Sequence, residues 1–153
     1  MIIPNIKRYG KNAKLYTENI MTDIAAAVIW QNGKILICRR PANKQCALLW
    51  EFPGGKQEKG ETLEQTLARE CMEELNIEIS VGKKLHETIA ENPGRTLRLN
   101  FFEAKITGGT LTKKEHAEIV WVLPEDLPKY DFCPSDKEFL LTRYFEKTFI
   151  SFQ

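Results

Sequence analysis

The segment from Gly55 to Ile77 constrains the fold of this chain more than any other part of its sequence. Thr62 and Gln65 have the spacing of a capping box, so a helix is expected to begin at Thr62. Asn76 is expected to end it, because asparagine tolerates the left-handed conformation that often follows a last helical turn. Between them, apolar residues recur at four-residue spacing and predict one buried stripe: Leu63, Leu67, Cys71 and Leu75.

Another side of this helix is acidic. Glu70, Glu73 and Glu74 are spaced i, i+3 and i+4, which places their side chains within roughly a 100° arc. Like charges so placed repel each other, and Arg69 relieves part of the repulsion through its i+4 neighbour Glu73. These residues alone allow two interpretations: a solvated acidic face, or a site for a hard cation such as Mg²⁺, which prefers oxygen ligands. A glycine-rich turn just before the helix favours the second, because glycine lets backbone approach a ligand closely.

The rest of the sequence predicts strands before, between and after two helices, which indicates a mixed α/β (α+β) domain. Asn32-Gly33 lies between two apolar runs, residues 24–30 and 34–40, and is typical of a hairpin turn. Further strand-like segments are residues 77–90, 95–106 and 119–123, the first two joined at Asn92-Pro93-Gly94.

Pro53-Gly54-Gly55 is expected to interrupt regular structure. A second helix is expected from about Ser135, because Ser135 and Glu138 have capping-box spacing. It is expected to direct four residues toward the core: Phe139, Leu140, Tyr144 and Phe145. Residues 1–20 show no sustained periodicity and are interpreted as an N-terminal arm, which leaves residues 21–153 as one domain.

The balance of charges indicates that this chain does not bind long nucleic acid. The chain has 22 basic and 21 acidic residues, whereas proteins that bind long nucleic acid usually carry a basic excess. Its 153 residues suffice to bury one core, and no stretch has the ~18 apolar residues that a membrane span needs. The four cysteines are scattered without a CxxC pair, which is typical of a reducing cytosol. A cytoplasmic protein without a membrane partner is therefore expected.

The segment from Gly55 to Ile77 also matches a family signature. The Nudix box reads G-x5-E-x7-R-E-U-x-E-E-x-G-U, where U is bulky and apolar. Its fixed polar and glycine positions are matched here by Gly55, Glu61, Arg69, Glu70, Glu73 and Glu74. Together with the motif Trp50-Glu51-Phe52-Pro53-Gly54-Gly55-Lys56, this resembles the MutT-like branch of the Nudix hydrolases, over about residues 22–146. Cys71 at a bulky position and Asn76 at the usual glycine depart from the box, and neither departure removes a ligand.

The resemblance implies a Nudix fold, a mixed β-sheet sandwiched between helices. It implies a Mg²⁺-dependent pyrophosphohydrolase, with Mn²⁺ as a substitute ion, that cuts a nucleoside triphosphate between its α and β phosphates. The products would be the monophosphate and pyrophosphate, and the substrates 8-oxo-dGTP, CTP, dCTP or a modified pyrimidine nucleotide. The implied catalytic residues are Arg69, Glu70, Glu73 and Glu74, with Glu70 as general base and Arg69 orienting the glutamates. The implied metal ligands are Gly54, Glu70, Glu73, Glu74 and Glu115.

The resemblance also implies a set of substrate-side residues: Arg40, Gln45, Glu51, Phe52, Gly54, Gly55, Arg95 and Asp136. For the two arginines the alternative is ordinary surface charge, and Phe52 either walls a base pocket or fills the core. Asp136 would accept a hydrogen bond from a base amine, which favours a cytosine nucleotide. An acid in the first turn of a helix is, however, also favoured by the helix dipole without any ligand.

Two other functions stay open. The same box serves other nucleoside diphosphate derivatives such as ADP-ribose. A Nudix-fold module can also sense nucleotides without catalysis, although every box glutamate is present here. The expected partner is a small nucleotide in each case, and either a monomer or a homodimer fits the sequence.

Overall fold

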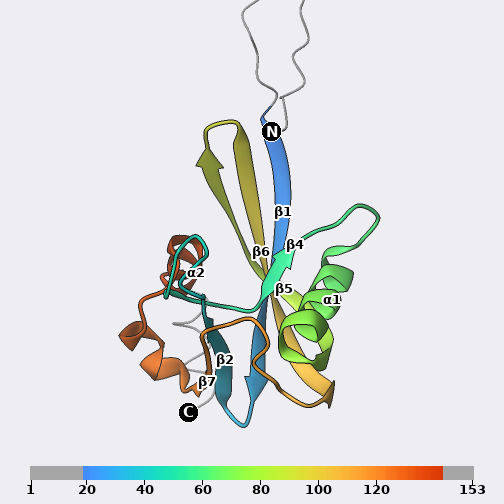
Figure 1. Ribbon diagram of the computed structural model, residues 1–153, viewed down its shortest axis with the longest axis vertical. Helices are drawn as coiled ribbons and strands as arrows, with labels where there is room; N and C mark the ends of the chain where they lie inside the picture. Colours follow the sequence, from blue (N-terminus) through green and yellow to red (C-terminus); the bar gives the residue numbers. More distant parts are fainter. Residues whose placement is uncertain (1–18, 143–153) are drawn as a thin grey trace, which may run out of the picture.

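The computed structural model of the protein describes residues 19–142, which form a mixed β-sheet with a helix against each face (Figure 1). Its strands are β1 (Ile20–Gln31), β2 (Lys34–Arg39), β3 (Trp50–Glu51), β4 (Gly54–Lys56), β5 (Ile77–Asn92), β6 (Arg95–Gly109) and β7 (Glu118–Val122). Its helices are α1 (Leu63–Leu75), the short 3-10 helix η1 (Pro124–Lys129) and α2 (Pro134–Leu140). The strands run in the order β3-β2-β1-β6-β5, with β4 paired to β1 and β7 to β2. Between residues 19 and 142, no helix is long and apolar enough to cross a membrane.

Both predicted strand connections are confirmed. Asn32 and Gly33 have positive φ, 52° and 72°, and join β1 to β2 in the two-residue turn that such a sequence favours. Pro93-Gly94 joins β5 to β6, and these two strands extend beyond the predicted bounds. In addition, β1 pairs in parallel with β6, which places the long β5–β6 hairpin beside the first strand of the described residues.

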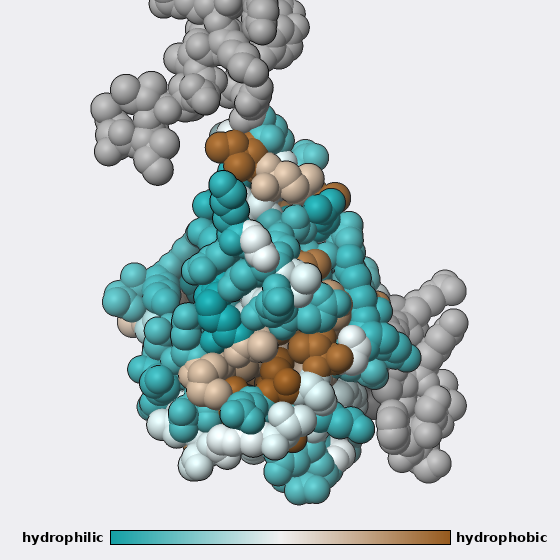
Figure 2. Space-filling view, turned by 90° about the vertical axis from the view of Figure 1, so that its right-hand side faces the viewer, coloured by the Kyte–Doolittle hydropathy of each residue, from teal (hydrophilic) through white to brown (hydrophobic). Residues whose placement is uncertain are grey.

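The residues of β1 alternate between two cores, one on each face of the sheet. The odd-numbered residues from Ala25 to Ile29 pack against the apolar stripe of α1. The even-numbered Ala26 and Val28 pack on the opposite face, in a cluster that includes Phe101 and Phe139 of α2. The predicted sandwich of a mixed sheet between helices is therefore confirmed. On the side of the molecule that carries α1, hydrophilic residues dominate the surface around a smaller apolar group (Figure 2).

Both predicted ends of α1 are confirmed. The Gln65 amide donates to the Thr62 hydroxyl at 3.1 Å, and the Thr62 amide donates to the Gln65 side chain at 2.9 Å. Asn76 has the left-handed conformation, with φ 56° and ψ 39°. Asparagine adopts this conformation more readily than other residues that carry a Cβ, so its substitution for glycine leaves the helix end intact.

The expectation that Pro53-Gly54-Gly55 interrupts regular structure is wrong from Gly54 onward. Gly54 and Gly55 begin β4, which runs antiparallel to β1. A Cβ at Gly54 would lie 1.9 Å from the carbonyl oxygen of Ala25, so a residue with a side chain could not approach β1 this closely. The glycines therefore continue the sheet because they lack side chains.

The predicted capping box of the second helix is also wrong. The helix begins at Pro134, and its cap residue Cys133 makes no side-chain capping bond. Proline presets the backbone at a first helical position, and Glu138 accepts a hydrogen bond from the hydroxyl of Thr88 on β5 instead. Phe139 is fully buried, as predicted. Tyr144, Phe145 and all but the last two residues of the predicted arm 1–20 lie outside the described residues.

Candidate active site

β4 lies close to α1, and the absence of a side chain at Gly55 leaves space between them for one carboxylate. A Cβ at Gly55 would lie 2.3 Å from the carboxyl carbon of Glu70. The Glu70 side chain is only 15% exposed and therefore occupies the space that any larger residue at position 55 would fill. The glycine that the sequence places before the helix thus fixes where a glutamate on the helix can lie.

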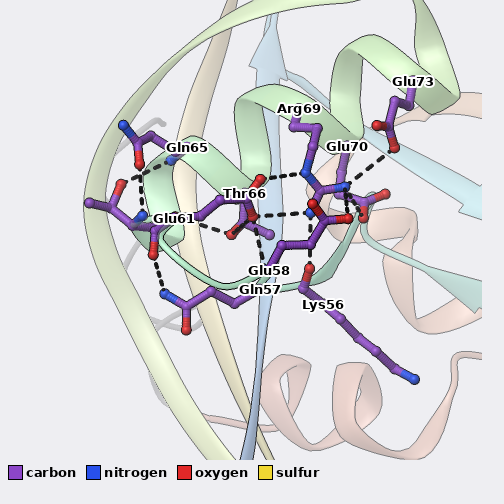
Figure 3. Close-up of polar contacts among 10 residues, drawn as sticks. Lys56, Gln57, Glu58, Glu61, Gln65, Thr66, Arg69, Glu70 and Glu73 are labelled. Atoms are coloured by element: carbon purple, nitrogen blue, oxygen red, sulfur yellow. Dashed lines mark hydrogen bonds and ion pairs between the residues drawn. The ribbon is translucent and has the colours of Figure 1, made fainter.

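Arg69 binds the loop before α1 to the acidic side of the helix (Figure 3). Its guanidinium donates to both carboxylate oxygens of Glu61, at 2.5 Å from Nε and 3.1 Å from Nη2. Its Nη1 donates to Glu70 at 2.9 Å and to Glu73 at 3.3 Å. The hydrogen bond from Arg69 lowers the pKa of Glu61 to about 2, because it stabilises the charged form. The guanidinium is therefore directed at protein carboxylates, as an orienting role requires.

Glu74 is the most strongly perturbed acid of this group. Its side chain is 15% exposed, and burial together with the charges of Glu70, Glu51 and Glu115 raises its pKa to about 9. Burial also raises the pKa of Glu70. The interaction between these two carboxyl groups favours the charged form of Glu70 and the protonated form of Glu74. Near neutral pH, these acids can all be charged only if a cation offsets their repulsion.

Glu115 is brought to this group by a loop that is bound to the end of α1. The amides of Thr112 and Lys114 donate to the carbonyls of Leu75 and Glu74, at 2.9 Å and 3.3 Å. These bonds satisfy carbonyls that a helix end otherwise leaves unpaired. The Glu115 side chain is 50% exposed, and its charge contributes to the raised pKa of Glu74.

The donor chemistry of this group fits a hard divalent cation. The buried acids offer carboxylate oxygens, which Mg²⁺ prefers, and their repulsion is the kind that a cation relieves. Glu73 is more peripheral, because its side chain is 56% exposed and turns toward Arg69. Among the described residues, no three acids, histidines or cysteines already stand close enough together to hold an ion. Binding would therefore have to draw the carboxylates closer.

Sequence reasoning missed His116, which the structure places within this group. Its side chain is 4% exposed, and its Nε2 lies 3.3 Å from Oε1 of Glu51 and 3.7 Å from Oε2 of Glu74. The other oxygen of Glu51 accepts a hydrogen bond from Nη1 of Arg40 at 2.8 Å. The only sequence signal was its position directly after Glu115, and periodicity does not show that a loop side chain points inward.

Two substrate-side residues are buried in the structure. Phe52 packs against Phe132 and Phe139, so it fills the core. Asp136 lies next to it and accepts a hydrogen bond from the Phe52 amide at 3.0 Å. Burial raises the pKa of Asp136 to about 7. This carboxyl group therefore has a structural partner in addition to any ligand.

The remaining substrate-side residues lie at different distances from the acids. Arg40 not only contacts Glu51 but also donates from Nε to the backbone carbonyl of Gln45, at 2.6 Å. Arg95 begins β6, six residues before Phe101, which lies across β1 from Gly54. At about 3.3 Å per residue this is roughly 20 Å along the strand. The structure therefore brings Arg40 next to the acidic group and leaves Arg95 at the far end of the β5–β6 hairpin.

The raised pKa of Glu74 predicts how the stability of the metal-free protein depends on pH. Between the ordinary glutamate value of 4.5 and about 9, the folded protein keeps a proton that the unfolded chain releases. Stability should therefore fall as pH rises through this range, and Mg²⁺ should offset the fall at alkaline pH. We expect thermal unfolding in a chelator to show this slope, and Glu74→Gln to flatten it. A wild-type slope in that variant would contradict the assignment to Glu74.

Comparisons with known proteins identify the family and the fold that this chain resembles. The sequence model of the NUDIX domain matches residues 21–142. The CTP pyrophosphohydrolase of Escherichia coli K12 is 41% identical over 116 residues, which cover 76% of this chain and 86% of that protein. A putative 8-oxo-dGTP diphosphatase 2 of Mycobacterium tuberculosis is 33% identical over 117 residues, covering 74% and 82%. A solution structure of an Escherichia coli protein superposes with a TM-score of 0.72 at 36% identity, covering 90% of this chain and 94% of that one.

Proposed function

Because this chain belongs to the Nudix family of hydrolases, which act on phosphoric anhydride bonds, we propose that it hydrolyses a nucleoside triphosphate in the presence of Mg²⁺. The bond cut lies between the α and β phosphates, and the products are the nucleoside monophosphate and pyrophosphate. The preferred substrate in this proposal is a cytosine nucleotide or an oxidised guanine nucleotide, the classes named by its relatives.

One observation carries the proposal: the buried, mutually repelling acids between α1, β3 and the loop before β7. A site that holds Glu70 and Glu74 at 15% exposure with raised pKa values is costly without a ligand. Strongly perturbed acids in one place are typical of catalytic sites. The divalent cations that accompany a triphosphate would supply the missing positive charge.

In this proposal Glu70, Glu74 and Glu115 hold the metal, with the Gly54 carbonyl and the more exposed Glu73 as further ligands. The cation, when bound, neutralises phosphate charge and makes a nearby water a better nucleophile. Glu70 is assigned as the general base that takes a proton from the attacking water. Three features support this role: its raised pKa, its burial against Gly55, and the hydrogen bond from Arg69 that fixes its orientation.

The direct test is a panel of nucleotides assayed for pyrophosphate release by the purified protein. CTP, dCTP, 8-oxo-dGTP and unmodified dGTP should be compared with ADP-ribose, each with Mg²⁺ and with chelator. We expect release of pyrophosphate from at least one triphosphate, dependent on the ion. Turnover of ADP-ribose alone, or release of single phosphate, would contradict the proposed reaction.

Asp136 provides a separate prediction about base selection. We propose that its second oxygen accepts from a base amine while the Phe52 amide binds the first. Asp136→Asn keeps the shape and one accepting oxygen, so it should lower kcat/KM for the best nucleotide by roughly ten- to a hundredfold, about 1–3 kcal/mol. Poor substrates should be affected much less. The ratio of kcat/KM between best and worst substrates, in wild type and variant, measures this, and an unchanged ratio would leave Asp136 with the structural role alone.

A further inference from the structure

Resting on the proposed function, we propose that His116 is a positioning residue that orients the carboxylate of Glu51 beside Glu74. These two acids belong to different elements, β3 and α1, and the His116 ring lies between them. Arg40 extends the chain of contacts on the far side of Glu51. The residue thereby connects the Arg40 side of the site to the carboxylates proposed to hold the metal.

The backbone on each side of His116 is held by a hydrogen bond. Two residues before it, the Lys114 amide donates to the Glu74 carbonyl at 3.3 Å. One residue after it, the Ala117 amide donates to the Arg39 carbonyl on β2 at 2.9 Å. The ring therefore sits on a short segment anchored to both α1 and the sheet. These two bonds fix the position of the His116 backbone relative to both elements.

The chemistry of the ring indicates which atom matters. The carboxylate of Glu51 also accepts from Arg40, so at the His116 contact it is the acceptor and Nε2 is the donor, at 3.3 Å. Both oxygens of Glu51 are then occupied and its plane is fixed. The neighbouring oxygen of Glu74 lies 3.7 Å from Nε2, beyond a hydrogen bond, so the ring packs against this carboxyl group without binding it.

The other ring nitrogen supports a role beyond packing. Nδ1 of His116 is buried and has no hydrogen-bond partner among the described residues. An unpaired buried polar atom is unfavourable, and an apolar side chain of similar size would fill the same space without it. The favourable polar contact of the ring is therefore the one that Nε2 makes with Glu51.

A matched pair of variants isolates the N–H group. His116→Gln and His116→Met have side chains of similar length and volume, but only glutamine places a donor near the position of Nε2. Loss of a polar group in the shell of side chains around a metal site typically lowers metal affinity or activity by about 10–100-fold. We expect His116→Met to show such a loss as a higher Mg²⁺ half-saturation and nucleotide KM, and His116→Gln to stay within about threefold of wild type. Unfolding temperatures without metal should be similar.

Two further measurements separate this inference from the proposed function. The rise of unfolding temperature on titration with Mg²⁺ reports metal binding without turnover, and His116→Met should need about 10–100-fold more ion than His116→Gln. In a Glu51→Gln background, His116→Met should cause little additional loss if it acts through Glu51. Equal behaviour of the methionine and glutamine variants in these titrations would overturn the positioning role. Failure of wild type to hydrolyse any nucleotide would instead overturn the proposed function.

Discussion

Glu74→Gln is expected to lower kcat/KM by about a thousandfold, which corresponds to about 4 kcal/mol, while the fold stays intact. The structure explains why both outcomes should occur together. In the metal-free protein the Glu74 carboxyl keeps its proton up to about pH 9, so a neutral amide of the same shape replaces a group that is already neutral. The charged form is needed only when a doubly charged ion binds, and the amide cannot provide it.

Unfolding temperature and activity must therefore be measured on the same preparation. Without metal, Glu74→Gln should unfold at or above the wild-type temperature near pH 8, and Mg²⁺ should no longer raise that temperature. Glu118→Gln is the matched control, because Glu118 is an exposed acid on β7 that pairs with Arg39 at 3.8 Å. The control should retain both activity and the Mg²⁺ response. Wild-type turnover in Glu74→Gln would refute the metal-site assignment.

The second large effect is expected at Gly55. In Gly55→Ala the new methyl group would lie 2.3 Å from the Glu70 carboxyl carbon, the flexible end of a side chain. The Glu70 side chain should rotate away at little cost in stability, and its carboxyl group should no longer lie against Gly55 on β4. Because a positioned general base typically contributes 10²–10⁴-fold, we expect kcat to fall by at least about a hundredfold. Steady-state kinetics beside thermal unfolding would measure this.

Two other glycines serve as controls for that result. In Gly54→Ala the methyl group would lie 1.9 Å from the Ala25 carbonyl oxygen, so a strand must move and stability should fall by about 1–3 kcal/mol or more. In Gly82→Ala, on β5, the nearest atom is Cβ of Glu103 at 3.2 Å, and activity should be unchanged. Gly55→Ala could instead lose stability as Gly54→Ala does, while its folded fraction keeps the wild-type specific activity. That result would show that Glu70 is not the general base.

Much of the fold could be predicted because its determinants are local. The capping box at Thr62, the left-handed end at Asn76 and the turn at Asn32-Gly33 depend on residues within a few positions of one another. The apolar stripe of α1 follows from helical periodicity in the same way. The acidic side of that helix could also be predicted, because the spacing of its glutamates fixes the side of the helix on which they lie.

Where long-range contacts compete with local preferences, local reasoning failed. Gly54 and Gly55 look like a break in the sequence, yet the absence of side chains allows β4 to lie against β1. Glu138 has the spacing of a capping partner, but its carboxylate accepts a hydrogen bond from the hydroxyl of Thr88 on β5, fifty residues earlier in the chain. In both places a partner distant in the chain provides a stronger contact than the neighbour in sequence.

By itself, then, the sequence determined the helix that carries the acids, the sandwich of layers and the family to which the chain belongs. Only the tertiary structure decided which acids are buried together, because Glu51 and Glu74 lie on separate elements and meet through His116. It likewise decided that Asp136 binds the backbone of Phe52, 84 residues earlier in the chain. The physical reason is the same in each case: periodicity states which way a side chain points from its own element, whereas burial, and with it the pKa of a carboxyl group, depends on the segments that fold over it.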